Sequence, residues 1–179
     1  MKTVSIDNKT FKLFISEQAI EKRVKELATQ INTELCNENV VFIAILNGSF
    51  MFASDLLKLI NFNVQISFLK LTSYLGDKST GNVKQLIGLN EDIEGKTVVI
   101  IEDIVDTGTT LELVKKQLIG YEPKAMKFAT LLLKPDVYKG KIPIDYVGFE
   151  VPSSFLIGYG LDYDGFGRNY PAIYTVEKE

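Results

Sequence analysis

Three acidic side chains, those of Glu102, Asp103 and Asp106, lie within five residues of one another. Crowded carboxylates repel, so this arrangement is costly unless they meet water, cations or hydroxyl donors. Side chains alternate along a strand, so we expect Glu102 and Asp103 to face opposite sides and to divide the binding of a sugar and a metal. Asp106 lies beyond the strand, free to face a reacting centre. The alternative is that these acids simply lie on a solvent-exposed edge of the protein. That alternative is reasonable for any one of them and much less so for all three.

The segment 107–110, Thr-Gly-Thr-Thr, follows these acids directly. It lies between a predicted strand and a predicted helix, where backbone N–H groups and the positive end of the helix dipole favour an anion. Thr107, Thr109 and Thr110 add hydroxyl donors, and Gly108 allows a close backbone approach or a positive φ. These features predict a phosphate site. A routine turn with a threonine N-cap is the alternative.

The chain contains no histidine. Ser-His and Cys-His nucleophiles, histidine metal sites and imidazole bases are therefore excluded. Acid-base chemistry must come from Asp, Glu, Lys or Tyr, and a bound metal is expected to be a hard cation such as Mg2+, held by carboxylates and substrate oxygens.

Three further positions are candidates on weaker grounds. The segment 47–49, Asn-Gly-Ser, ends an apolar run and is either a functional loop or a tight turn in which Ser49 caps the next helix. Lys134 ends another apolar run, where its ammonium group is either solvated or a donor to a carbonyl oxygen. Phe155 lies in an irregular segment, where its ring either joins the core or stacks on a flat base.

The elements that position these residues alternate between strands and helices. Periodic and continuous apolar patterns predict strands over 2–6, 40–46, 65–74, 83–89, 97–103, 127–133 and 146–151, and helices from Ser16 to about 35, over 50–60 and over 110–119. This order predicts an α/β fold with a mainly parallel central sheet flanked by helices, whose ligands bind at the carboxyl edge of the strands.

Composition limits the classes of partner and compartment. The chain has 179 residues, 46% hydrophobic and 24% charged, with a net charge of −3. This is typical of one globular domain and argues against a nucleic-acid or anionic-membrane partner. No apolar run is long enough for a transmembrane helix, and the single cysteine, Cys36, cannot form an intramolecular disulfide, so a reduced cytoplasmic location is expected.

The segment 98–110 resembles the phosphoribosyl pyrophosphate (PRPP) motif of the type I phosphoribosyltransferases, most closely that of the 6-oxopurine branch. The resemblance implies that Glu102 and Asp103 contact ribose hydroxyls and Mg2+, and that Asp106 handles the purine N7 proton. It places the 5-phosphate of PRPP against the segment 106–110. Thr109 stands where many relatives carry lysine.

The resemblance covers most of the chain and implies roles for other residues. Leu46, Asn47 and Gly48 match a pyrophosphate loop that often contains a cis non-proline peptide, with Asn47 where many relatives have lysine. Ser73 and Tyr74 match a flexible loop, over about 73–83, that closes over the reacting centre. On the purine side, Lys134 matches the residue that reads purine O6, Phe155 matches the residue that stacks on the base, and the backbone of Leu156 matches the group at the base edge. Asp162 matches a residue that supports a second Mg2+, and Arg168 matches a residue that binds pyrophosphate.

The expected protein is a single type I phosphoribosyltransferase domain over 1–179, with a small irregular hood made of the N-terminal strand and about 135–179. The resemblance implies transfer of the phosphoribosyl group of PRPP to N9 of hypoxanthine, and also of guanine, giving IMP or GMP and pyrophosphate. It also implies a homodimer or homotetramer.

Two alternatives remain open. One is a pyrimidine phosphoribosyltransferase or a related nucleotide-sensing regulator, against which Asp106, Lys134, Phe155 and Asp162 argue. The other is a non-catalytic nucleotide-binding module, which would keep the phosphate site without the chemistry.

Overall fold

A six-stranded sheet forms the centre of the computed structural model, which describes residues 3–72, 84–89 and 91–176. Its strand order is β5-β4-β3-β6-β7-β8. All neighbours pair in parallel except β4 and β5, which are antiparallel. The strands are β3 (Val40–Leu46), β4 (Gln65–Thr72), β5 (Lys84–Ile87), β6 (Thr97–Val105), β7 (Ala125–Leu133) and β8 (Tyr146–Glu150). The prediction of an α/β fold with a mainly parallel sheet is confirmed.

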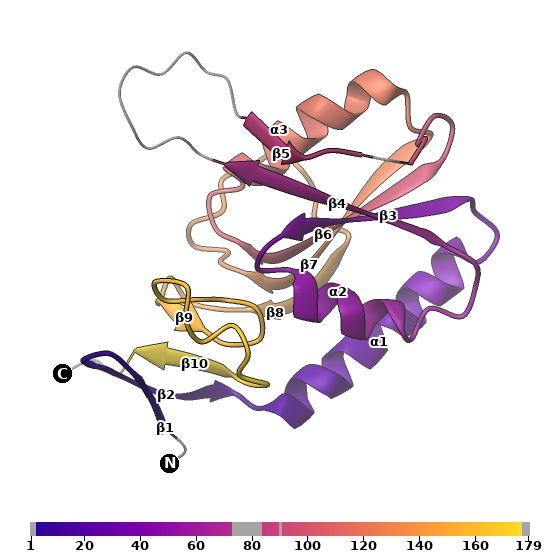
Figure 1. Ribbon diagram of the computed structural model, residues 1–179. Helices are drawn as coiled ribbons and strands as arrows, with labels where there is room; N and C mark the ends of the chain where they lie inside the picture. The colour runs from indigo at the N-terminus through magenta and orange to yellow at the C-terminus, as the bar shows by residue number, and fades with distance from the viewer. Residues whose placement is uncertain (1–2, 73–83, 90, 177–179) are drawn as a thin grey trace.

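Helices cover both faces of this sheet (Figure 1). Helices α1 (Glu17–Leu35) and α2 (Phe50–Leu57) pack on one face, and α3 (Thr109–Leu118) packs on the other. The continuous apolar sequence of β3 and β6 follows from this, because both faces of these strands are buried. Helix α1 starts near Ser16 as predicted, and Ser16 caps it, since its Oγ accepts from Ala19 N at 3.2 Å. No helix in the described ranges is long and apolar enough to cross a membrane.

A second, four-stranded sheet joins the two ends of the chain (Figure 1). Its order is β1-β2-β10-β9, and all its pairings are antiparallel. The strands are β1 (Thr3–Ile6), β2 (Lys9–Ile15), β9 (Leu156–Ile157) and β10 (Ile173–Val176). Only β1 was among the predicted strands. The sequence pattern does not reveal β2, because only Phe11 and Ile15 of its seven residues are buried.

Several predicted boundaries were wrong, three of them close to the site. Helix α2 ends at Leu57 rather than at 60. Helix α3 begins at Thr109 and is followed by a 3-10 turn, Ile119–Tyr121. Strand β6 continues to Val105, because Ile104 and Val105 pair with Leu132 and Leu133 of β7. The first two acids of the motif therefore lie inside the strand, which explains their burial.

Candidate functional site

Glu102 and Asp103 form a buried carboxylate pair near the carboxyl end of β6. Each residue is only 9% exposed. Burial raises the pKa of both, well above the usual range for Glu102, where the neighbouring Asp103 charge adds to the effect. The two carboxyl groups are close enough for each to influence the pKa of the other. Glu102 Oε2 has no hydrogen-bond partner among the described residues, which fits a pair that meets a cation or hydroxyl donors when a ligand binds.

The turn 107–110 lines a pocket together with Glu102 and residues 104–106 and 111. Gly108 has φ +87 and occupies the N-cap position of α3, so the alternative of a threonine N-cap was wrong. The hydroxyls of Thr107 and Thr109 lie 2.9 Å apart beside it. A small pocket with hydroxyl groups at the start of a helix suits a phosphate. The ring of Tyr138, which sequence reasoning missed, lies against Gly108 where a Cβ would be.

The loop after β3 contacts this carboxylate pair. The peptide bond between Leu46 and Asn47 is cis, as the resemblance implied. A Cβ on Gly48 would overlap the carboxylate of Asp103. Ser49 occupies the N-cap position of α2, but its side chain makes no capping bond; its Oγ donates instead to Ile45 O at 2.6 Å. The N-cap position predicted for Ser49 is therefore confirmed, but its side chain does not cap the helix, because the buried hydroxyl has a backbone acceptor one turn earlier.

Substituting Gly48 with alanine should displace either this loop or Asp103. We expect Gly48→Ala to raise the Kd for pyrophosphate in the presence of Mg2+, by about tenfold or more, because small misplacements weaken oriented binding sites strongly. Calorimetric titration measures this change. Gly120→Ala is the matched control, since nothing lies within 4 Å of a Cβ there. Equal affinity for pyrophosphate in the Gly48 variant and the wild type would contradict the expectation that the loop at 46–48 binds pyrophosphate.

Arg168 contacts two residues of the segment after β9. Its Nη2 lies 2.6 Å from Asp162 Oδ1, and its Nη1 donates to Gly160 O at 2.7 Å. The other oxygen of Asp162 accepts from Gly165 N at 2.8 Å. The Arg168 charge also favours ionisation of Asp103, although burial outweighs this effect and the net pKa shift is upward. Arg168 therefore pairs with one of the predicted metal-supporting acids, Asp162, and its charge acts on a second, Asp103.

Asp106 and Lys134 form an ion pair, with Lys134 Nζ 2.9 Å from Asp106 Oδ2. The side chain of Lys134 is 12% exposed and that of Asp106 is 48% exposed. Sequence reasoning selected both residues but did not predict their contact, because they are 28 residues apart in the chain. The pair sets a proton acceptor and a cationic donor beside the pocket at 107–110.

Phe155 exposes half of its surface at the edge of the second sheet. Its ring packs edge-on against Tyr163, with centroids 5.8 Å apart, and lies 6.5 Å from the ring of Phe11. This arrangement holds one aromatic face in place and leaves it accessible, as stacking on a flat ligand requires. The next residue, Leu156, is buried in β9. Phe11 was missed because it lies on β2.

The predicted metal residues divide between two places. Glu102 and Asp103 share one position, whereas Asp162 is paired with Arg168. Across the described ranges, no group of three or more Asp, Glu, Cys or His residues is arranged to hold a metal ion. Substrate oxygens would have to complete any coordination shell, as Mg2+ commonly requires. Ser73, Tyr74 and the predicted loop over 73–83 lie outside the described residues.

Comparison with known proteins agrees with this arrangement. The family described as phosphoribosyl transferase domain matches residues 15–164. The chain is 41% identical to a hypoxanthine-guanine phosphoribosyltransferase of Aquifex aeolicus, over 96% of this chain and 98% of that protein. It is similar to a crystal structure of a hypoxanthine-guanine phosphoribosyltransferase from Bacillus anthracis, with a TM-score of 0.86, 42% identity and coverage of 93% and 97%.

A crystal structure of a hypoxanthine phosphoribosyltransferase from Staphylococcus aureus is also similar, with a TM-score of 0.87, 40% identity and coverage of 93% of this chain and 91% of that chain. These similarities cover nearly the whole length of both proteins in each comparison. The chain belongs to the phosphoribosyltransferase family.

Proposed function

We propose that this protein is a 6-oxopurine phosphoribosyltransferase, which transfers the 5-phosphoribosyl group of PRPP to N9 of hypoxanthine, and also of guanine, releasing pyrophosphate. The observation that carries the proposal is the Asp106–Lys134 ion pair beside the pocket at 107–110. The pocket suits a phosphate, and the ion pair places a hydrogen-bond acceptor and a donor next to it, where they could both bind the edge of one base. Incubation with hypoxanthine, PRPP and Mg2+, followed by chromatography, tests the proposal through formation of IMP.

PRPP would lie along the carboxyl edge of β6. Its 5-phosphate would accept hydrogen bonds from the backbone and hydroxyls of Asp106, Thr107, Gly108, Thr109 and Thr110, next to the N-terminus of α3. Thr109 would offer a hydroxyl here where many relatives have lysine. The ribose hydroxyls would meet Glu102 and Asp103; Glu102 Oε2 has no other donor among the described residues.

Mg2+ is the cofactor that we propose, because the residues available to it are carboxylates. Glu102 and Asp103 would hold one ion together with ribose oxygens, and Asp162 would support a second. Bound Mg2+ supplies neutralising charge for the pyrophosphate group. Pyrophosphate itself would lie between Arg168 and the backbone of Leu46, Asn47 and Gly48, with Ser73 and Tyr74 closing over it.

The purine would lie between Phe155 and the Asp106–Lys134 pair, under a hood that includes the second sheet. Lys134 would donate to O6, which selects hypoxanthine, guanine or xanthine over adenine, because the amino group of adenine would meet another donor. The backbone at Leu156 would meet the base edge. When a base binds, the ion pair between Lys134 and Asp106 must open or be shared with the base. The Asp106 carboxylate can then accept the N7 proton while N9 attacks the ribose carbon.

Substituting Lys134 with methionine keeps the length of the side chain but removes its charge and donors. We expect kcat/KM for hypoxanthine to fall roughly 10- to 100-fold, since a hydrogen bond to a charged group contributes about 1.5–3 kcal/mol. Preference for hypoxanthine over adenine should fall in parallel. Steady-state assays with each base measure both effects, and the exposed Lys139→Met variant is the control. Unchanged base preference would rule out this role for Lys134.

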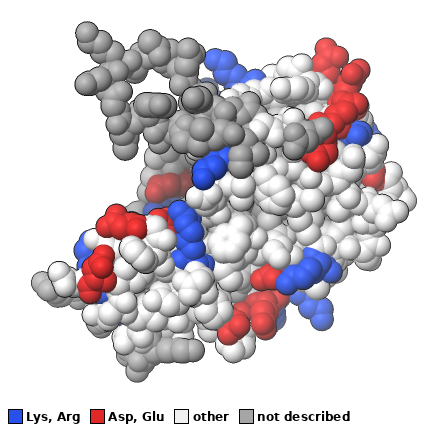
Figure 2. Space-filling model, viewed as in Figure 1, with Lys and Arg blue, Asp and Glu red and all other residues white. Residues whose placement is uncertain are grey.

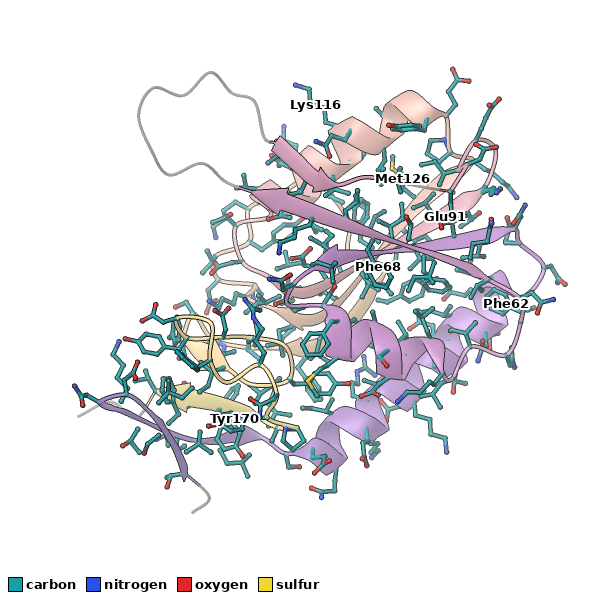
Figure 3. The ribbon with its side chains drawn as sticks, viewed as in Figure 1. Phe62, Phe68, Glu91, Lys116, Met126 and Tyr170 are labelled. Carbon is teal, nitrogen blue, oxygen red and sulfur yellow. The ribbon has the colours of Figure 1, made fainter. Side chains whose placement is uncertain are left out.

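A second copy of the chain is the protein partner that we propose, as a homodimer or homotetramer. Phe50 and Phe68 are each at least 40% exposed. Figure 2 shows a broad uncharged area on the face of the molecule that is turned to the viewer. Figure 3, drawn in the same view, places Phe68 and Phe62 in this area. Exposed apolar area of this kind commonly marks a protein interface. We also propose a cytoplasmic location, which suits a chain with one free cysteine, Cys36.

A further inference from the structure

Tyr159 has an unusual backbone conformation for a bulky residue. Its φ is +47, and it lies between Gly158 at φ +96 and Gly160 at φ +101. Glycine tolerates such angles, but tyrosine adopts them at an energetic cost and keeps them only where its surroundings hold it. Tyr159 is only 4% exposed. The contacts of its side chain therefore explain why a tyrosine occupies this position.

The hydroxyl of Tyr159 donates a hydrogen bond to Asp55 Oδ2 at 2.6 Å. Asp55 lies on α2, and its Oδ1 pairs with Lys58 Nζ at 2.6 Å. Burial and the Asp55 carboxylate raise the pKa of Tyr159, so the hydroxyl stays protonated and remains a donor. The backbone N–H of Tyr159 donates to Tyr170 O at 2.7 Å, and Figure 3 shows Tyr170 near β10. Tyr159 is thus fixed at its side chain by Asp55 and at its backbone by Tyr170.

The residue after Tyr159 touches the loop at 46–48. A Cβ on Gly160 would overlap the carbonyl oxygen of Gly48, so the two backbones are in close contact. Gly160 also receives a hydrogen bond from Arg168 Nη1 and donates its own N–H to Arg168 O at 2.9 Å. Consecutive residues, 159 and 160, therefore contact the two ends of the segment 48–55.

We propose that the Tyr159–Asp55 hydrogen bond is a clamp that positions Gly48 and Arg168 for the pyrophosphate group. The inference rests on the proposed function, which assigns pyrophosphate to these residues. Tyr159 and Asp55 are positioning residues, because they act through Gly160 on the loop and on Arg168. Two contacts on consecutive residues fix the distance between α2 and the segment 158–168, and hence the width of the pyrophosphate site.

The chain offers a matched control for this clamp. Tyr146 is fully buried and donates to Glu34 Oε2 at 2.8 Å, which is also a hydrogen bond from a buried tyrosine to a carboxylate. It joins the first residue of β8 to the end of α1, at the amino ends of the parallel strands and away from the site. Tyr146→Phe and Tyr159→Phe therefore remove equivalent bonds in different places.

Calorimetric titration with pyrophosphate in the presence of Mg2+ is the direct test, together with Tm and the KM values for PRPP and hypoxanthine. We expect Tyr159→Phe to raise the Kd for pyrophosphate and the KM for PRPP about tenfold, with little change in the KM for hypoxanthine. Both tyrosine variants should lose Tm similarly, but Tyr146→Phe should keep its pyrophosphate affinity. Asp55→Asn retains an acceptor oxygen, so its effect should be smaller and in the same direction.

Wild-type pyrophosphate affinity in both Tyr159→Phe and Asp55→Asn would overturn the clamp, whatever their Tm. So would an equal loss of affinity in Tyr146→Phe, because the effect would then come from general destabilisation. A wild-type protein that does not bind pyrophosphate also overturns it. A wild-type protein that binds pyrophosphate but forms no nucleotide would overturn the proposed function alone, and the titrations would still decide whether the clamp exists.

Discussion

Replacing Asp106 with asparagine should lower kcat for hypoxanthine by about 100-fold or more while leaving PRPP binding largely intact. Asparagine keeps the size of the side chain and one acceptor oxygen, but it cannot hold the proton that leaves N7. General acid-base groups contribute about 10²–10⁴ in rate, so the loss should appear in turnover. The phosphate cradle at 107–110 consists of backbone and hydroxyl groups that the substitution does not remove.

The control for this substitution is Asp136→Asn, which removes an exposed carboxylate two residues beyond Lys134. Single-turnover kinetics and calorimetric titration with PRPP and Mg2+ separate chemistry from binding. Equal turnover in Asp106→Asn and the wild type would remove Asp106 from the chemistry. Loss of PRPP affinity with unchanged single-turnover rates would make Asp106 a binding residue only.

The second large effect is a gain of stability from the loss of a buried acid. Glu102→Gln should raise the Tm of the ligand-free protein at pH 8 by roughly 2–10 °C, because the neutral amide avoids the cost that burial and the Asp103 charge impose on an ionisable carboxyl at that pH. The same substitution should lower kcat/KM for PRPP, since the amide cannot supply negative charge to a cation. The pair at Glu102 and Asp103 would thus be maintained for binding at the expense of stability.

The pH dependence of this gain follows from the direction of the pKa shift. The folded protein holds a proton on Glu102 well above the ordinary value of 4.5, where the unfolded chain has released it. The free energy of unfolding therefore falls as pH rises from 4.5 through the raised pKa. Glu102→Gln lacks this dependence, so the difference in Tm between variant and wild type should be small near pH 4 and should grow toward pH 8.

Differential scanning calorimetry across that pH range measures the effect, with the exposed Glu94→Gln as control. A difference that stays constant with pH, or a variant that is less stable at pH 8, would contradict the assignment of a protonated buried carboxyl to the ligand-free protein.

The central sheet and the motif on β6 were predictable because their physical signals are local. Continuous β-branched runs predict buried parallel strands, and the turn at 107–110 predicts an anion site from residue types alone. The start of the first helix near Ser16 was predictable for the same reason. The second sheet was harder, because β9 has two residues and β2 buries only two side chains, so neither carries a clear period.

The contacts that complete the site depend on tertiary structure. Lys134 and Asp106 meet only because β6 and β7 are parallel neighbours, and Gly160 reaches Gly48 only because the chain returns over the carboxyl edge. Tyr138 and Tyr159 show no local feature that separates them from other tyrosines. Their roles became visible from a ring against Gly108 and a positive φ, neither of which the sequence displays.

Pyrophosphate release, measured with PRPP and Mg2+ and with each of adenine, hypoxanthine, guanine, xanthine and uracil supplied separately, tests the central claim most directly. A 6-oxopurine phosphoribosyltransferase should release pyrophosphate with hypoxanthine, and also with guanine, but not with adenine or uracil. Release with uracil alone, or with none of the 6-oxopurines, would contradict the account.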